Sequence, residues 1–379
     1  MGGEKRLSNH SPRAFGALSR HMLGLVDSDD TALTGPPEDP PVASTLEAVA
    51  RIAGVSRASV SRVVNGKAGV ASHIVEAVTA AVEATGYVPN RAARTLVTRR
   101  TGTVLVVVSG ADKSMRKWGL GEVLADPFFA RVAGGLMGSL RPRDIDPVLM
   151  LAVTDAERAR VVSYVREGNA DGVLLVSAEA NDALPMLLTR ARVPVVLFSR
   201  PGVPAPVSYV DVDNEAGGAM AAEHLIARGC RRLGIITGPI EIAGAEDRLK
   251  GFLRATQHLL PAEVAIAAGT FSVDSGSHAM IQLLAQGVDG VFASNDNMAV
   301  GAILAAQERG VDVPGEVAVI GYDDTIAALM CRPTVTTIRQ PIEAIAAAMT
   351  RLLLDLIDDP GMLPRHEVLA PGLILRGSA

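Results

Sequence analysis

The sequence predicts an α/β protein, with an all-α helix-turn-helix module near the N-terminus and a larger domain of doubly wound parallel sheets. Between residues 45 and 85, helical stretches are separated by a glycine-containing break. From residue 104 onward, short apolar runs alternate with helical stretches, which is typical of βαβ units with parallel strands buried on both faces. The composition agrees, because 48% apolar and only 3% aromatic residues suit stacked helix and sheet layers.

Length and cysteine content narrow the class of protein. A chain of 379 residues is expected to form two or three compact units. No apolar run reaches the ~18 residues that a membrane span needs, and no secretion signal is visible near the start. Cys230 and Cys331 are too few for a disulfide framework or a cysteine zinc site. We therefore expect a cytoplasmic protein without a membrane partner.

The net charge of −5 is distributed unevenly. Residues 45–100 carry 8 Lys/Arg against 3 Asp/Glu, whereas residues 1–44 carry 4 against 6 and residues 101–379 carry 24 against 32. A basic segment on an acidic protein favours phosphate contact by one module. An ordinary solvated surface is the alternative that the charge alone leaves open.

Helix signals define the N-terminal module. The residues STLE at 44–47 have the pattern of a capping box with Ser44 as the cap, so a helix is expected to start there. Gly54 ends this helix, and Ser56 can cap a second one. A third helix is expected from about Ser72 to Thr85, where apolar residues recur on one face.

After the N-terminal module the sequence pattern changes. Pro89 interrupts the helical pattern and Asn90 can cap a very short helix from Arg91 to about Thr98. Apolar strands are then expected at Val104–Val108, Val148–Ala152, Gly172–Val176, Val195–Phe198, Leu233–Ile236, Gly290–Ala293 and Val317–Ile320.

The second helix of the module carries side chains suited to reading DNA. In a major groove it would present Arg57, Ala58, Ser59 and Arg62. Arginine can donate two hydrogen bonds to O6 and N7 of guanine, and alanine can contact the thymine methyl group. A plain helical hairpin is the alternative that the spacing leaves open.

Eight stretches occur in the order TLEAVARIAGVSRASVSRVVNG, GYVPNRAARTL, DPFFA, DVDNEAGG, AEDRLKGF, SNDNMAVGA, VPGEVAVIGYDD and PTVTTIRQP. In this order they resemble the LacI/GalR family of bacterial transcriptional regulators, over about residues 45 to 376. Only the leader, residues 1–44, and an insertion at about residues 112–125 fall outside the pattern. The resemblance implies a regulator, commonly a repressor, that responds to a small-molecule effector of the sugar type.

The resemblance also implies the DNA interface. In the family a hinge helix opens the minor groove of the operator, and Leu96 occupies the position of the wedge between base steps. An ordinary apolar linker residue is the plainer alternative. Two hinge helices at a dyad require a homodimer, so a near-palindromic double-stranded DNA operator is expected. The DNA-binding residues are expected to be Ser56, Arg57, Ala58, Ser59, Arg62, Asn65, Asn90, Arg91, Ala93, Arg94 and Leu96.

The larger domain resembles the two-lobed periplasmic-binding-protein fold. Ligands of such sheets bind beyond the carboxyl ends of the strands. Ser199 departs from the family, which usually carries Asp there, and this casts doubt on an ordinary hexose as the ligand. The effector-binding residues are expected to be Phe128, Phe129, Ser199, Arg248, Asn295, Asp323 and Gln340.

Each effector candidate also has a plainer explanation when it is taken alone. Asp323 and Asn295 could be turn residues, Arg248 could form a surface ion pair and Phe129 could be part of the core. Convergence of carboxylate, amide and guanidinium groups beside an aromatic face favours a site for a polyhydroxylated ligand. The insertion at residues 112–125 could cover this site or form a disordered loop.

The expected domain boundaries follow from these assignments. Residues 1–44 are expected to form a disordered leader, residues 45–89 the DNA-binding domain, residues 90–100 the hinge helix and linker, and residues 101–379 the effector-binding and dimerisation domain. Within the last, the first lobe should comprise about residues 101–210 and 338–360, and the second about residues 211–337 and 361–376.

Other function classes lack their motifs. An enzyme on a doubly wound fold would need a phosphate-binding loop or an activated nucleophile, and the sequence contains neither GxxxxGK[ST] nor GxSxG. The seven histidines show no metal-ligand spacing. A solute-binding protein of a transport system would need an export signal, and this class gives no role to residues 45–100. We expect no enzymatic activity, no catalytic residues, no metal and no cofactor.

Overall fold

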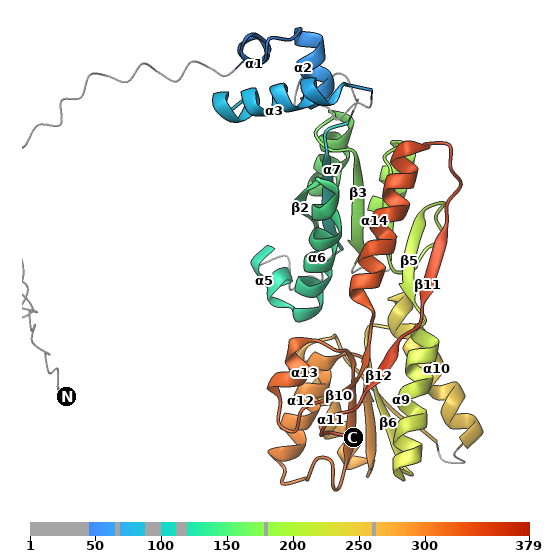
Figure 1. Cartoon of the computed structure of the whole chain (residues 1–379). Coiled ribbons are helices and arrows are strands. Elements are labelled where there is room, and N and C mark those ends of the chain that lie inside the picture. Colours follow the sequence, from blue (N-terminus) through green and yellow to red (C-terminus); the bar gives the residue numbers. More distant parts are fainter. Residues whose placement is uncertain (1–44, 65–68, 88–99, 111–119, 178–180, 260–262) are drawn as a thin grey trace, which may run out of the picture. The chain divides into compact units, whose positions relative to one another are not determined.

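The computed structural model describes residues 45–64, 69–87, 100–110, 120–177, 181–259 and 263–379 (Figure 1). The expected leader, the expected hinge helix and most of the insertion lie outside these residues. The chain divides into two compact units, Met1–Pro89 and Asn90–Ala379, and each is considered by itself below.

The first unit is a bundle of three helices, α1 (Leu46–Ala53), α2 (Arg57–Val64) and α3 (Ser72–Thr85). The expected bounds of α3 are confirmed. The expected cap of α1 is wrong by one residue, because the Thr45 side chain accepts from the Ala48 amide at 3.2 Å and the helix begins at Leu46. Ser44 lies outside the described residues.

The turn between α1 and α2 depends on Gly54. Gly54 ends α1 with φ +66°, a left-handed conformation that costs glycine nothing. Ser56 then accepts from the Ser59 amide at 3.1 Å and caps α2, as expected. Val49 of α1 and Val60 of α2 are fully buried and pack with Val78 of α3. This small core fixes the crossing of the three helices.

The second unit contains two six-stranded sheets (Figure 1). The first has the order β11-β5-β4-β3-β1-β2 and is parallel throughout. Helices α6 and α14 share a core cluster on one face, and α7 and α8 contact the sheet through a second cluster. Its elements are β1 (Thr103–Ser109), α5 (Leu120–Ala125), α6 (Pro127–Leu140), β2 (Asp146–Ala152), α7 (Asp155–Arg166), β3 (Gly172–Ser177), α8 (Leu184–Arg190), β4 (Val195–Phe198), β5 (Ser208–Val212), α14 (Ile342–Asp358) and β11 (His366–Leu369).

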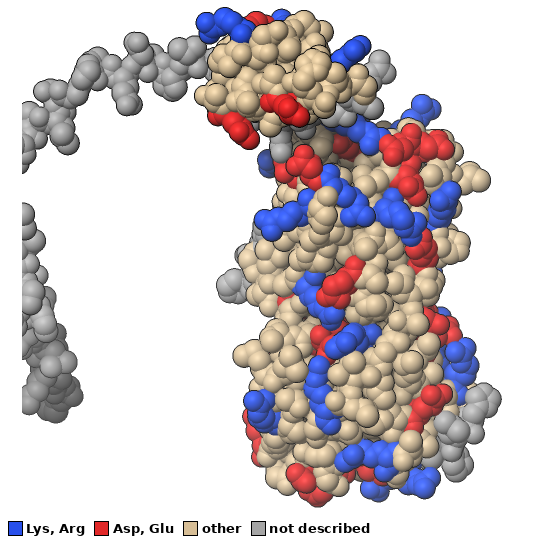
Figure 2. Space-filling model, viewed as in Figure 1, with Lys and Arg blue, Asp and Glu red and all other residues tan. Residues whose placement is uncertain are grey.

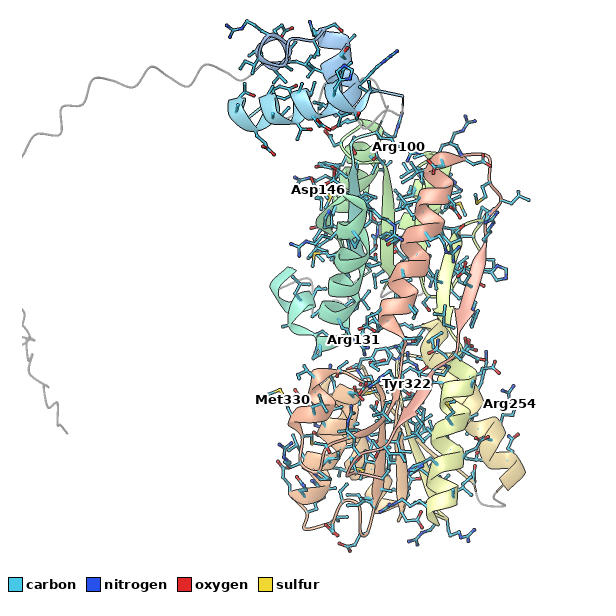
Figure 3. The ribbon with its side chains drawn as sticks, in the orientation of Figure 1. Arg100, Arg131, Asp146, Arg254, Tyr322 and Met330 are labelled. Atoms are coloured by element: carbon cyan, nitrogen blue, oxygen red, sulfur yellow. The ribbon has the colours of Figure 1, made fainter. Side chains whose placement is uncertain are left out.

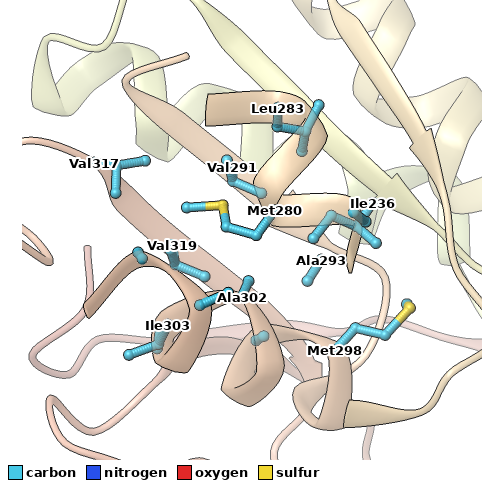
Figure 4. Packing of buried hydrophobic residues seen from close by; sticks show 14 of the residues in the cluster. Ile236, Met280, Leu283, Val291, Ala293, Met298, Ala302, Ile303, Val317 and Val319 are labelled. Carbon is cyan, nitrogen blue, oxygen red and sulfur yellow. The ribbon is translucent and has the colours of Figure 1, made fainter. Parts of the chain in front are cut away.

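The second sheet has the order β12-β10-β9-β8-β6-β7, and only β12 runs antiparallel to its neighbour. Helices α11 and α12 pack in one cluster with this sheet (Figure 4), and α9 and α10 pack in another. Its elements are α9 (Asn214–Arg228), β6 (Leu233–Thr237), α10 (Ala243–Leu259), β7 (Ala265–Ala268), α11 (Val273–Ala285), β8 (Gly290–Ala293), α12 (Asp296–Gln307), β9 (Ala318–Asp323), α13 (Ile326–Met330), β10 (Thr336–Arg339) and β12 (Gly372–Ile374).

The chain passes between the two sheets three times, after β5, after β10 and after β11. The expected lobe boundaries differ most at the third passage. The sequence pattern predicts residues His366–Leu369 in the second lobe, but they pair with β5 in the first sheet. This edge strand alternates exposed and half-buried residues and has no apolar run, so only its long-range pairing reveals its lobe.

The surface of the second unit carries charges of both signs. Figure 2 shows acidic and basic side chains interspersed over the visible face of this unit. Within the part of the chain that the structure describes, every helix is too short or too polar to span a lipid bilayer.

Candidate DNA-reading and effector-binding sites

The candidate DNA-reading surface is the exposed side of α2. Ser56, Arg57, Ala58 and Arg62 are exposed, and Ser59 is half-buried with its hydroxyl 3.0 Å from that of Ser56. A row of two arginines, an alanine and serines is therefore open to a groove while Val60 faces the core.

Arg57 already has a partner in the free protein. Its Nη1 lies 2.8 Å from Oε1 of Glu47 on α1, with both side chains mostly exposed. Such an exposed pair is screened by water and contributes little, so it is easily exchanged for a base or phosphate. The other expected DNA contacts, Asn65, Asn90, Arg91, Ala93, Arg94 and Leu96, lie outside the described residues.

Arg248 is the centre of the candidate effector site. Helix α10 begins at Ala243 and places Arg248 in its second turn. Its Nε donates to Oδ1 of Asn214 at 2.8 Å and its Nη1 to the carbonyl oxygen of Ser294 at 2.6 Å. Its guanidinium carbon lies 3.7 Å from the centre of the Tyr322 ring. Arg248 is 8% exposed, so it forms no surface ion pair.

Helices α9 and α10 must approach closely to place Arg248 beside Asn214. Gly218 of α9 permits this, because a Cβ there would overlap the carbonyl oxygen of Arg248. The stretch DVDNEAGG therefore combines a buried amide with the small residue that admits the neighbouring helix.

Asp323 ends β9 and lies beside Arg248. Its Oδ1 is 3.9 Å from Nη1 of Arg248 and accepts from Nε2 of Gln340 at 2.7 Å. Burial raises the pKa of Asp323 to about 8, and the Asp296 carboxyl adds to this, although Arg248 acts in the opposite direction. The predicted residues Arg248, Asp323 and Gln340 thus form one buried cluster.

Asn295 follows β8 and uses both ends of its amide within the fold. Its oxygen accepts from the Met298 amide at 2.9 Å, which caps α12, and its nitrogen donates to the carbonyl oxygen of Phe271 at 2.9 Å. The plainer explanation of this residue, a local turn cap, therefore describes what its side chain does here. Its peptide nevertheless adjoins Ser294, which binds Arg248.

Ser199 follows β4 and leads to two residues that the sequence analysis missed, Asp211 and Asn214. Its hydroxyl donates to Oδ1 of Asp211 at 3.1 Å, and Nδ2 of Asn214 donates to the same oxygen at 3.3 Å. Burial raises the pKa of Asp211. Asp211 thus supplies a carboxylate beside the strand end where the family usually carries Asp. The signal was its place within DVDNEAGG, but the short strand β5 was not recognised.

Three aromatic rings, those of Phe128, Phe129 and Phe198, contact one another beside Ser199. Phe128 makes edge contacts with Phe129 and with Phe198, at ring-centre distances of 5.4 and 5.7 Å. Phe198 is the last residue of β4 and directly precedes Ser199. Six of the seven predicted effector residues are therefore connected, through contacts and the neighbours Phe198 and Ser199, in a series from Phe129 to Gln340, whereas the side chain of Asn295 is used within its own lobe.

The comparisons with known proteins agree with this architecture. Residues 45–90 match the family described as bacterial regulatory proteins, lacI family, and residues 222–379 match the periplasmic binding protein-like domain. The chain is 42% identical over 343 residues to the HTH-type transcriptional regulator CelR of Thermobifida fusca, covering 88% of this chain and 98% of the relative. This chain belongs to the LacI family of transcriptional regulators. That family is not one of enzymes.

Other LacI-family proteins support the assignment. The HTH-type transcriptional repressor PurR of Klebsiella pneumoniae is 32% identical over 321 residues, covering 83% of this chain and 90% of PurR. A solved CelR–cellobiose complex matches with TM-score 0.67 and 39% identity, over 88% of this chain and 99% of that one. A lac repressor dimer bound to operator and the anti-inducer ONPF matches with TM-score 0.70 and 25% identity, over 88% and 98%.

Proposed function

We propose that this LacI-family regulator is a repressor that binds a near-palindromic operator as a homodimer, and that a sugar bound between its lobes controls its operator affinity. The observation that carries the proposal is the series of contacts from Phe129 to Gln340, half-buried at Phe128, Phe129 and Ser199 and buried from Asp211 onward, which spans the strand ends of both sheets. Such strand ends are where doubly wound sheets bind ligands.

The chemistry of this cluster favours an uncharged, polyhydroxylated effector. The buried carboxyl groups of Asp211, Asp296 and Asp323 outnumber the one positive charge of Arg248 among them. Burial raises the pKa of all three carboxyl groups, because the surroundings disfavour negative charge. A phosphorylated sugar would add more. The similarity to CelR, solved with cellobiose, suggests a disaccharide of that type.

On DNA, Arg57 and Arg62 would bind base edges in the major groove while the segment at residues 90–100 enters the minor groove. Leu96 is the proposed wedge, whose insertion compensates for unstacking by bringing more protein surface against bent DNA. Effector binding changes operator affinity if the two lobe arrangements differ in their affinity for the ligand and also in their affinity for the operator.

Calorimetric titration of the purified chain tests the effector assignment. Cellobiose is expected to bind, whereas a sugar phosphate and a nucleoside are not. Arg248→Met and Asp323→Ala should each abolish the binding, because each removes one group of the buried cluster. Arg143→Met is the control, since the Arg143 side chain donates to the Ser139 carbonyl oxygen within the first lobe. Binding of the sugar phosphate but not of cellobiose would contradict the inference that the site favours an uncharged ligand.

A further inference from the structure

One arginine joins the two lobes at the candidate effector site. Arg131 lies on α6, one turn after Phe128, and its side chain is 24% exposed. Its Nη1 donates to the backbone carbonyl oxygens of Asp323 and Asp324, at 3.1 and 3.0 Å. These carbonyl groups belong to the second lobe, at the end of β9, and Figure 3 shows Arg131 where the two lobes meet. The guanidinium therefore holds the main chain of an effector candidate.

The other edge of the Arg131 guanidinium is fixed within the first lobe. Nε and Nη2 donate to the two carboxylate oxygens of Glu343, at 3.2 and 3.0 Å. Glu343 lies in the first turn of α14, which packs on α6. The hydrogen bond from Arg131 lowers the pKa of Glu343, so the pair stays charged at neutral pH. A two-point pair of this kind fixes the plane of the guanidinium.

The main chain that Arg131 holds has an unusual conformation. Asp323 and Asp324 have φ values of +103° and +58°, a region that residues with a side chain rarely adopt. The carboxylate of Asp324 is held by Arg339 and Arg376 of the second lobe. A strained main chain persists only where its surroundings impose it. Here the Asp324 carboxylate is held within the second lobe, whereas the carbonyl oxygens of Asp323 and Asp324 are held by Arg131 of the first lobe.

We propose that Arg131 is a positioning residue of the effector site, which keeps Asp323 in its observed geometry only while the lobes are together. Lobe arrangement and effector binding then depend on each other through this contact, and Glu343 orients the guanidinium. The inference rests on the proposed function for the role of Asp323 as an effector contact. Lysine would supply the charge but could not form the planar fork.

Hydrogen exchange of the ligand-free full chain tests the contact itself. Arg131→Met and Arg131→Lys are both expected to speed amide exchange in residues 321–328 by about tenfold, because opening of this segment no longer breaks two hydrogen bonds. Arg143→Met, just beyond α6, should leave exchange there unchanged, since Arg143 bonds within its own lobe. Wild-type exchange rates in both Arg131 variants would overturn the proposal.

A second measurement separates positioning from simple loss of stability. Operator affinity is measured with and without cellobiose, on a DNA fragment selected with the wild-type protein. Both Arg131 variants should keep the wild-type melting temperature within a few degrees yet lose most of the cellobiose response, and lysine should not rescue it. An undiminished response would overturn the role. A wild type without any response contradicts the sugar effector instead, and the exchange result then decides on Arg131 alone.

Discussion

At the scale of single residues, burial sets the charge state of the effector cluster. The pKa of Asp323 is raised to about 8 and that of Asp296 to about 6, from an ordinary value of 3.8, mainly because the ionised forms are desolvated. The folded protein therefore holds more protons than the unfolded chain between about pH 4 and pH 8. Stability must fall as the pH rises through this window, by at most about 1.4 kcal/mol per pH unit for each group.

Asp323→Asn should flatten this dependence between pH 6 and pH 8, because the amide cannot ionise yet can still accept from Gln340. Melting temperatures at several pH values measure the slope. Asp324→Asn is the matched control, since hydrogen bonds from Arg376 and Arg339 outweigh burial and lower the pKa of Asp324. Its contribution is present above about pH 4 and lost only below, so the control should reduce stability at neutral pH without changing the slope. Equal slopes for wild type and Asp323→Asn would contradict the assignment.

The exposed arginines of α2 carry a second prediction at this scale. Arg62→Ala should weaken binding to the selected operator by ~1 to 3 kcal/mol and to random DNA only slightly, because a base contact is lost rather than general attraction to phosphate. Arg57→Ala should also weaken operator binding more than binding to random DNA, although this substitution additionally removes the ion pair with Glu47. Arg51→Ala on α1 removes the same charge outside the reading helix. Fluorescence titration measures all three, and equal losses on both DNAs would argue against base reading.

At the scale of elements, the left-handed turn between α1 and α2 decides whether the reading helix is presented. Gly54→Ala places a side chain at φ +66°, where no neighbour lies within 4 Å of the new Cβ, so the cost is conformational and about 1 to 2 kcal/mol. Amide exchange across residues 46–64 should accelerate and operator affinity should fall.

Gly138→Ala is the control, because here the same substitution is expected to stabilise the protein rather than destabilise it. Gly138 lies inside α6 with open space around its Cβ position, so alanine should stabilise that helix by roughly 0.5 to 1 kcal/mol. A Gly54→Ala protein with unchanged exchange over α1 and α2 would show that the turn tolerates a side chain.

At the scale of the whole molecule, three chain passages join two separately packed sheets. Polar contacts from Arg131 to the end of β9, from Arg200 to Asp247 (2.7 Å) and from Asn297 to Asp126 (3.4 Å) connect the lobes beside the candidate site. Because each contact has one partner on either lobe, a change in lobe arrangement would alter them. The proposed regulation would use the lobe arrangement as its two-state element.

Linkage gives this molecule a quantitative test. If cellobiose changes operator affinity by some factor, saturating operator must change cellobiose affinity by the same factor, because the two binding free energies share one thermodynamic cycle. Calorimetric titration of cellobiose with and without the operator fragment measures the second factor. Unequal factors would mean that the effector acts outside this equilibrium, for instance by altering the oligomeric state.

The sequence by itself determined the elements with strong local signals. The cap at Ser56, the turn at Gly54 and the apolar runs of β4 and β8 act within a few residues, so their positions could be predicted closely. The loops that follow such strands could be chosen as candidate sites by the rule for doubly wound sheets.

Only the tertiary structure decided which lobe contains β11, that Asp211 stands beside Ser199, and that Arg131 crosses to the end of β9. The short strands β5 and β11 have mixed polar sequences, so their place depends on pairing with residues far along the chain. The Arg131 contact joins residues about 190 positions apart. Local propensity carries no information about such distances, whereas packing of the two sheets fixes them.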